Sequence, residues 1–200
     1  MCSPLLLRPS LLLFCLILLG MTAHPVQAQQ PTEPFSTVDL RLAGTRNINR
    51  NFLHEFWKPG GGVEATLATP FYLGFLEVGT AVHRYEAEQD VPGFGALWLY
   101  AGWGLGMDVA DRIRLEGSGR IGNYHMSFDT GSEFTGVINE SELALMVQSR
   151  LAVRPVGSVS VFVSGSYLQV YTFLRLKLWY VTAGLSYRLN TSEWLKGFLK

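Results

Sequence analysis

The chain has 200 residues, a formal net charge of 0 and 16% charged residues, against about 25% in an ordinary soluble domain. This balance leaves no basic footprint for nucleic acid, so the composition excludes a nucleic-acid-binding protein. Cys2 and Cys15 are the two cysteines, and both lie near the start, so the rest of the chain has neither a disulfide framework nor a thiolate metal site.

Residues 1–28 have the layout of a secretory signal peptide. Arg8 precedes an apolar run at 11–19, and Val26 and Ala28 are small residues at the positions that a signal peptidase reads. The apolar run is too short for a transmembrane helix, which needs about 20 residues. No later segment is apolar over such a length. If the protein crosses a membrane, it must therefore cross with strands.

Alternating apolar and polar residues predict eight β-strands in the remainder. Val38, Leu40 and Leu42, for example, share one face of the first strand. We expect a short periplasmic leader at 29–34, a barrel at 35–189 and a periplasmic tail at 190–200. The predicted strands cover residues 36–46, 62–69, 72–85, 95–107, 112–127, 141–153, 158–171 and 175–189.

The connections between these strands alternate in length. The first (47–61), the third ("EAEQDVPGFG") and the fifth ("DTGSEFTGVINE") are long, whereas the even ones are short; only the seventh breaks the rule. An up-and-down barrel places odd and even connections at opposite ends, and outer-membrane barrels have longer loops outside the cell. We therefore predict that 47–61 and 128–140 lie outside.

The polar rows of the strands indicate which face is interior. They combine small residues with arginines and acids in matching number, and Lys177 is the only lysine within a predicted strand. A solvated outer face, as in a soluble lipocalin-like barrel, would be rich in lysine. The polar row therefore faces a narrow, closed lumen and the apolar row faces lipid. The predicted lumen charge network comprises Asp39, Arg41, Glu64, Glu77, Arg114, Glu116, Arg120 and Arg150.

Aromatic residues gather near the strand ends, a distribution typical of the two interfacial girdles of a membrane barrel. His83 lies on a polar row, where we expect it to form hydrogen bonds in the lumen. The glycines of "GWGLG" are predicted to relieve crowding there, and "HEFW" at 54–57 reads as a solvated loop and not a metal site. The predicted girdle residues are Phe35, Phe71, Tyr72, Tyr85, Phe94, Tyr124, Phe128, Tyr171, Trp179 and Tyr187.

The last predicted strand contains "TAGLSYRL". Thr182, Gly184, Tyr187 and Leu189 occupy the places of the carboxy-terminal signature that this stretch resembles, that of bacterial outer-membrane proteins. The resemblance implies a closing strand that pairs with the first and is read by the barrel assembly machinery. The overall architecture resembles the small eight-stranded outer-membrane proteins of the OmpA and OmpX type. Unlike the signature, the chain continues, with apolar residues at 194, 195, 198 and 199 that favour an interfacial segment.

One motif suggests an enzyme instead. His125 and Ser127 in "NYHMSF" point to one side of a strand and resemble the His-x-Ser pair of the lipid A 3-O-deacylases, which are eight-stranded barrels. The resemblance implies a serine nucleophile, a histidine base and an orienting acid, for which Glu140 is the candidate. Phe128 stands where that family has Asn, and two more strands follow here than in the family.

We therefore expect an all-β, eight-stranded antiparallel up-and-down transmembrane β-barrel in the bacterial outer membrane. The predicted role is structural or surface-interacting, without catalysis, cofactor or metal. A lipid A deacylase using His125 and Ser127, and a small pore, are the alternatives. The expected partners of this monomer are outer-membrane lipid and lipopolysaccharide, with the barrel assembly machinery acting during biogenesis.

Overall fold

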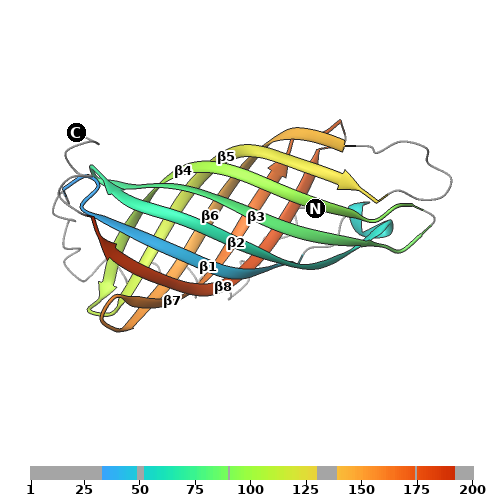
Figure 1. The fold of residues 1–200 in the computed structure, drawn as a ribbon. Helices are drawn as coiled ribbons and strands as arrows, with labels where there is room; N and C mark the ends of the chain where they lie inside the picture. The colour runs from blue at the N-terminus through green and yellow to red at the C-terminus, as the bar shows by residue number, and fades with distance from the viewer. Residues whose placement is uncertain (1–32, 49–51, 90, 130–138, 174, 192–200) are drawn as a thin grey trace, which may run out of the picture.

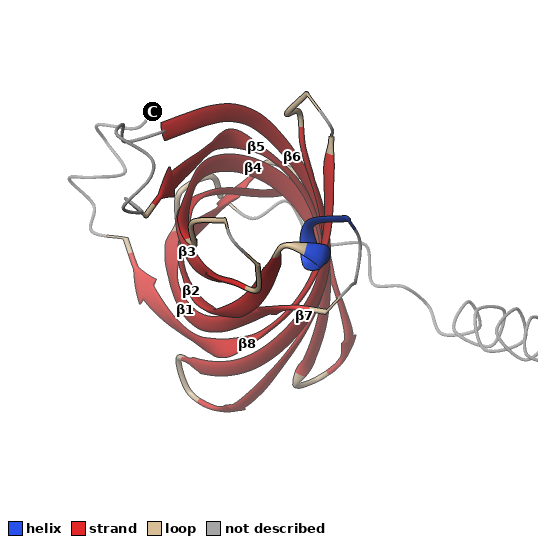
Figure 2. Ribbon diagram, turned by 90° about the vertical axis from the view of Figure 1, so that its right-hand side faces the viewer, coloured by secondary structure: helices blue, strands red, loops and turns tan. Residues whose placement is uncertain are grey.

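The computed structural model describes residues 33–48, 52–89, 91–129, 139–173 and 175–191. Its strands form one closed antiparallel barrel in the order β1 to β8, with β1 pairing to β8 (Figures 1 and 2). The predicted fold class is confirmed. The elements are β1 (Thr37–Asn47), the 3-10 helix η2 (Phe52–Glu55), β2 (Trp57–Phe71), β3 (Gly74–Ala87), β4 (Phe94–Ala110), β5 (Ile113–Phe128), β6 (Asn139–Val156), β7 (Val159–Val170) and β8 (Leu176–Asn190).

The two ends of the barrel differ. The turns β2–β3, β4–β5 and β6–β7 each join strands with two residues between them, and they lie at one end, hereafter the turn end. Gly157 in the last of these turns has a φ of +58°, a conformation that glycine adopts readily. The connections after β1, β3, β5 and β7 lie at the opposite end, hereafter the loop end, where η2 is found (Figure 1).

The strand alternation separates an apolar outer face from a packed interior. Leu42 and Val147 on the outer face are 67% and 61% exposed, while their neighbours along each strand are buried. In a closed barrel, such an outward apolar band is the surface that contacts lipid. Among the described residues, no helix is long and apolar enough to cross a membrane.

The largest difference from the predicted boundaries is at the start of β2. This strand begins at Trp57, where alternation predicted a start at 62, and Lys58 pairs with Glu86 of β3. The register shifts between Pro59 and Gly62. A proline followed by three glycines carries no alternation signal, and it accommodates this irregularity within the strand.

Candidate functional site

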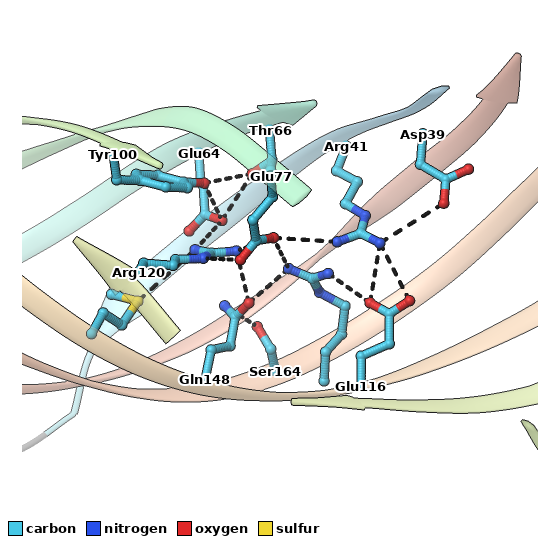
Figure 3. A network of polar contacts seen from close by, with 12 residues as sticks. Asp39, Arg41, Glu64, Thr66, Glu77, Tyr100, Glu116, Arg120, Gln148 and Ser164 are labelled. Carbon is cyan, nitrogen blue, oxygen red and sulfur yellow. Dashed lines mark hydrogen bonds and ion pairs between the residues drawn. The ribbon is translucent and has the colours of Figure 1, made fainter. Parts of the chain in front are cut away.

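The interior of the barrel contains a buried charge network centred on Arg120. The side chains of Arg120 and Glu77 are 0% exposed, and Arg120 Nε donates to Glu77 Oε1 at 2.6 Å (Figure 3). Arg120 Nη1 donates to Glu64 Oε1 at 3.0 Å, and Nη2 donates to Gln148 Oε1 at 2.8 Å. The guanidinium also lies over the ring of Tyr100, 4.5 Å from its centroid. Two carboxylates, an amide oxygen and an aromatic ring therefore offset the cost of burying this cation.

A second group of charges continues the network toward the turn end. Arg41 Nη2 and Arg150 Nη1 donate to Glu116 Oε2 at 3.1 and 2.8 Å. Both arginines also approach Glu77 Oε2, at 3.5 and 3.8 Å, so Glu77 links the two groups. Arg150 further donates to Gln148 at 2.7 Å. Side chains from several strands thus form one connected network across the lumen.

Ion pairs at the turn end complete this arrangement. Arg188 Nε donates to Asp39 Oδ1 at 2.7 Å, and Arg114 contacts Glu116 at 3.1 Å and Asp108 at 3.3 Å. The eight predicted lumen charges thus belong to one connected network, which Asp39 joins through Arg41 at 3.8 Å. Arg188 and Asp108 were missed, although Arg188 lies directly opposite Asp39 once β8 pairs with β1.

Glycines make room for the largest side chains of the network. A Cβ on Gly79 would lie 2.5 Å from the Tyr100 hydroxyl, and a Cβ on Gly102 would lie 2.8 Å from Cγ of Arg120. Gly102 belongs to "GWGLG", whose predicted role in relieving crowding is confirmed at this position. An alanine at either glycine would displace a residue of the network.

Toward the loop end the lumen is filled mainly by aromatic side chains. Tyr85 stacks on Phe94 with ring centroids 4.5 Å apart, and its hydroxyl lies 2.8 Å from that of Tyr180. Leu53 of η2, which is 4% exposed, belongs to the same buried cluster. We call this part of the cluster the aromatic plug; it comprises Tyr85, Phe94, Trp98, Tyr124 and Tyr180, each at most 2% exposed.

The aromatic plug corrects two predictions. Tyr85, Phe94 and Tyr124 are predicted girdle residues, yet they point inward, because each occupies an inward position of its strand. Alternation along the strand outweighs aromatic type. His83 does lie in the lumen, with its ring 4.6 Å from that of Tyr180, but neither of its ring nitrogens has a hydrogen-bond partner among the described residues.

Other predicted girdle residues do face outward. Tyr171 and Trp179 lie near the loop end and are 39% and 50% exposed, while Tyr72 and Tyr187, near the turn end, are 67% and 49% exposed. Phe35 and Phe71 are partly buried with their rings 5.7 Å apart, and Phe128 packs against the buried aromatic cluster. Outward aromatic residues therefore occur near both ends of the barrel.

The deacylase-like residues are not assembled into a triad. His125 pairs with Leu97 and Ser141 on the outer face, and Ser127 lies on the same face. Glu140 pairs with Met126, which is 3% exposed and points into the lumen. Directly paired residues share a sheet face, so the candidate acid lies on the opposite face from its histidine. The register does not favour this alternative.

The residues of the β8 motif divide between the two faces. Thr182 is buried and donates to Thr45 of β1 at 3.1 Å, and Gly184 lies opposite Ala43. Tyr187 and Leu189 face outward and pair with Leu40 and Val38 of β1. The motif therefore lies in the strand that closes the barrel.

Residues His54 and Glu55 of "HEFW" lie in η2. His54 Nε2 is 2.8 Å from Asn47 Oδ1, so its contact in the structure is an amide oxygen. In the part of the chain that the structure describes, no group of three or more His, Cys, Asp or Glu could hold a metal ion. The predicted signal peptide (1–28), residues 29–32 of the predicted leader (29–34) and residues 192–200 of the predicted tail lie outside the described residues.

No protein-family model and no curated protein matches this sequence. Several solved structures share its fold. Neisserial surface protein A has a TM-score of 0.56 at 12% identity, over 78% of this chain and 96% of that one. Ail of Yersinia pestis, in complex with the heparin analogue sucrose octasulfate, has a TM-score of 0.52 at 17% identity, over 79% of this chain and 100% of Ail. The outer membrane protein OprG from Pseudomonas aeruginosa has a TM-score of 0.52 at 10% identity, over 79% of this chain and 98% of OprG. This chain therefore has the fold of the small eight-stranded β-barrels of the bacterial outer membrane, and its apolar outer band is the surface with which such a barrel crosses the bilayer.

Proposed function

We propose that this protein is a monomeric outer-membrane β-barrel with a structural or surface-interaction role, and that it neither conducts ions nor catalyses a reaction. The observation that carries this proposal is the double closure of the lumen. The aromatic plug fills the part of the lumen toward the loop end, and the charge network around Arg120 crosses the lumen nearer the turn end. A barrel of eight strands has an interior that side chains can fill, so neither barrier leaves an aqueous path.

The distribution of polar residues on the outer face supports an orientation with the loop end outside the cell. On β5 the outward row is apolar at Ile113 and Leu115 near the turn end, and polar at Asn123 and Ser127 near the loop end. The loop end is thus suited to project beyond the hydrocarbon core. Outward polar residues near this end are Arg46, Arg84, Asn123, His125, Ser127, Ser141, Gln169 and Lys177.

The same surface supports the proposed partners. Arg46 and Lys177 are outward cations near the outward Trp179, at a level where lipopolysaccharide phosphates would lie in this orientation. Ile48, Phe52 and Phe173 are 59%, 54% and 101% exposed on the loops, and such apolar groups favour contact with another molecule. The β8 motif supports recognition by the barrel assembly machinery during insertion.

Ion conductance in planar lipid bilayers tests this proposal. The protein is first folded into lipid vesicles, where circular dichroism checks its strand content, and is then transferred to the planar bilayer. It should produce no current steps above the bare bilayer, because both barriers obstruct the lumen. As a control, Arg84→Gln alters only an exposed pair at the loop end and should be equally silent. Reproducible current steps from the unmodified protein would overturn the closed-lumen proposal and favour the small pore.

A further inference from the structure

The turn end of the lumen is hollow, in contrast to the loop end. A cavity of about 450 Å³ opens there beyond the charge network, and we call it the vestibule. Its lining includes arginines and hydroxyl residues: Arg112 of the β4–β5 turn, Arg114 of β5, Arg150 and Arg154 of β6, Ser160 of β7 and Ser186 of β8. A cavity of this size has the volume of a small-molecule site.

Two of these arginines lie directly opposite one another. The amide of Arg154 donates to the carbonyl of Arg112 at 2.8 Å, which continues the β5–β6 register beyond Ile113 and Val153. Both side chains line the vestibule. Like charges directly opposite in a sheet destabilise it, so this pair is costly when nothing lies between the two guanidinium groups.

The acids of the vestibule do not compensate this pair. Asp39 pairs with Arg188, Asp108 pairs with Arg114, and Glu116 lies among three arginines. Asp111, next to Arg112 in the turn, is exposed and is the remaining acid of the lining. Within the described residues, neither Arg112 nor Arg154 forms an ion pair with a carboxylate. The mouth of the vestibule therefore has an excess of positive charge.

Hydroxyl groups also line the vestibule. Ser160 and Ser186 lie opposite one another on β7 and β8, next to the β5–β6 wall. The site thus combines planar guanidinium donors with hydroxyl donors around a solvent-accessible space, a combination that suits the oxygens of phosphate and carboxylate groups.

We propose that the vestibule binds a ligand bearing a phosphate or carboxylate group, held between Arg112 and Arg154. Bound there, the anion neutralises the opposed pair and accepts hydrogen bonds from the vestibule walls. The chemistry of this site does not depend on the orientation of the barrel, but the compartment from which the ligand comes does. If the loop end lies outside the cell, as in the proposed function, the ligand comes from the periplasm.

The test uses the complete folded barrel in neutral detergent micelles, with inorganic phosphate and succinate as probes at an ionic strength fixed with chloride. Binding is measured by calorimetry and as a rise in the urea midpoint of unfolding, because a ligand that binds only the folded state stabilises it. Arg112→Gln/Arg154→Gln should weaken binding at least tenfold. The matched control Arg84→Gln, an arginine at the other end, should bind like the unmodified protein.

The outcomes separate a binding role from a structural one. Without probe, Arg154→Gln should unfold at the same or a higher urea concentration, since it removes a repulsion; a purely structural arginine would lower the midpoint. Arg112→Lys/Arg154→Lys retains the charges and should retain part of the affinity. Binding of phosphate alone, succinate alone or both supports the site and defines its ligand class. Binding of neither, or an undiminished response in the double glutamine variant, overturns it. A reversed topology would change the compartment and leave these results intact.

Discussion

At the scale of single residues, the central feature is an arginine with no solvent contact. Arg120 contacts Glu77, Glu64 and Gln148 at 2.6, 3.0 and 2.8 Å, and it lies over the ring of Tyr100. Placing an ion in such an interior is costly, and only the surrounding opposite charges and acceptors offset the cost. Removing one partner of a buried ion pair should therefore destabilise the barrel more than replacing both partners with apolar residues.

Replacing Arg120 with methionine should destabilise the barrel by about 3–5 kcal/mol, because Glu77 would be left buried without its main partner. The free energy of unfolding, from urea titration in detergent micelles, checks this. The double variant Arg120→Met/Glu77→Met should recover part of the loss. The matched control is Arg84→Met: its partner Asp129 lies 2.5 Å away, but the two side chains are 53% and 47% exposed. That exposed pair should contribute about 0–1 kcal/mol. A larger loss at Arg84 than at Arg120 would contradict the argument.

At the scale of elements, β8 closes the barrel by pairing with both β7 and β1. Its outward row includes Val181, Leu185, Tyr187 and Leu189, all at least 41% exposed to the lipid side. Its inward row includes Thr182 and Arg188, which contact β1 through Thr45 and Asp39. Closure therefore depends on both rows of one strand, since an unclosed edge would leave backbone groups unpaired in lipid.

Replacing Tyr187 and Leu189 with Asp should abolish insertion in cells, because it places two charges on the lipid face and removes the end of the motif. Removing residues 192–200 should have a much smaller effect. Heat-modifiable migration of membrane fractions on gels measures insertion, and the conservative Tyr187→Phe/Leu189→Ile variant serves as the control. If the truncated chain failed to insert while the Asp variant inserted normally, the assignment of the motif would be wrong.

At the scale of the whole molecule, three layers follow one another along the lumen: the aromatic plug, the charge network and the vestibule. The first is packed and aromatic, the second is ionic and paired, and the third is open with an excess of arginine. The two ends of the barrel therefore present different chemistry to the two sides of the membrane. Which layer faces which compartment depends on topology alone.

Single cysteines test that topology in intact cells with an impermeant thiol reagent. Glu88→Cys in the β3–β4 connection should label, and Ser158→Cys in the β6–β7 turn should label only after the outer membrane is opened. Both positions are exposed, so a difference in labelling reports sidedness and not burial. The opposite pattern would place the vestibule outside the cell. Glu88 belongs to the connections that the sequence predicts to be long and external.

The sequence by itself determined the strands and their two faces, because the side chains of a strand alternate and this alternation is local. The alternation also identified most of the charges that meet in the lumen, and the resemblance of the last strand to the outer-membrane signature implied its pairing with the first. The tertiary structure alone decided the depth at which each side chain lies, because depth depends on the tilt and stagger of strands distant in the chain. Alternation places Tyr85, Tyr124 and Tyr180 on inward rows, but only the stagger of β3, β5 and β8 brings the three together in one plug. Arg112 and Arg154, which no local pattern connects, lie opposite one another only because β5 and β6 pair in this register.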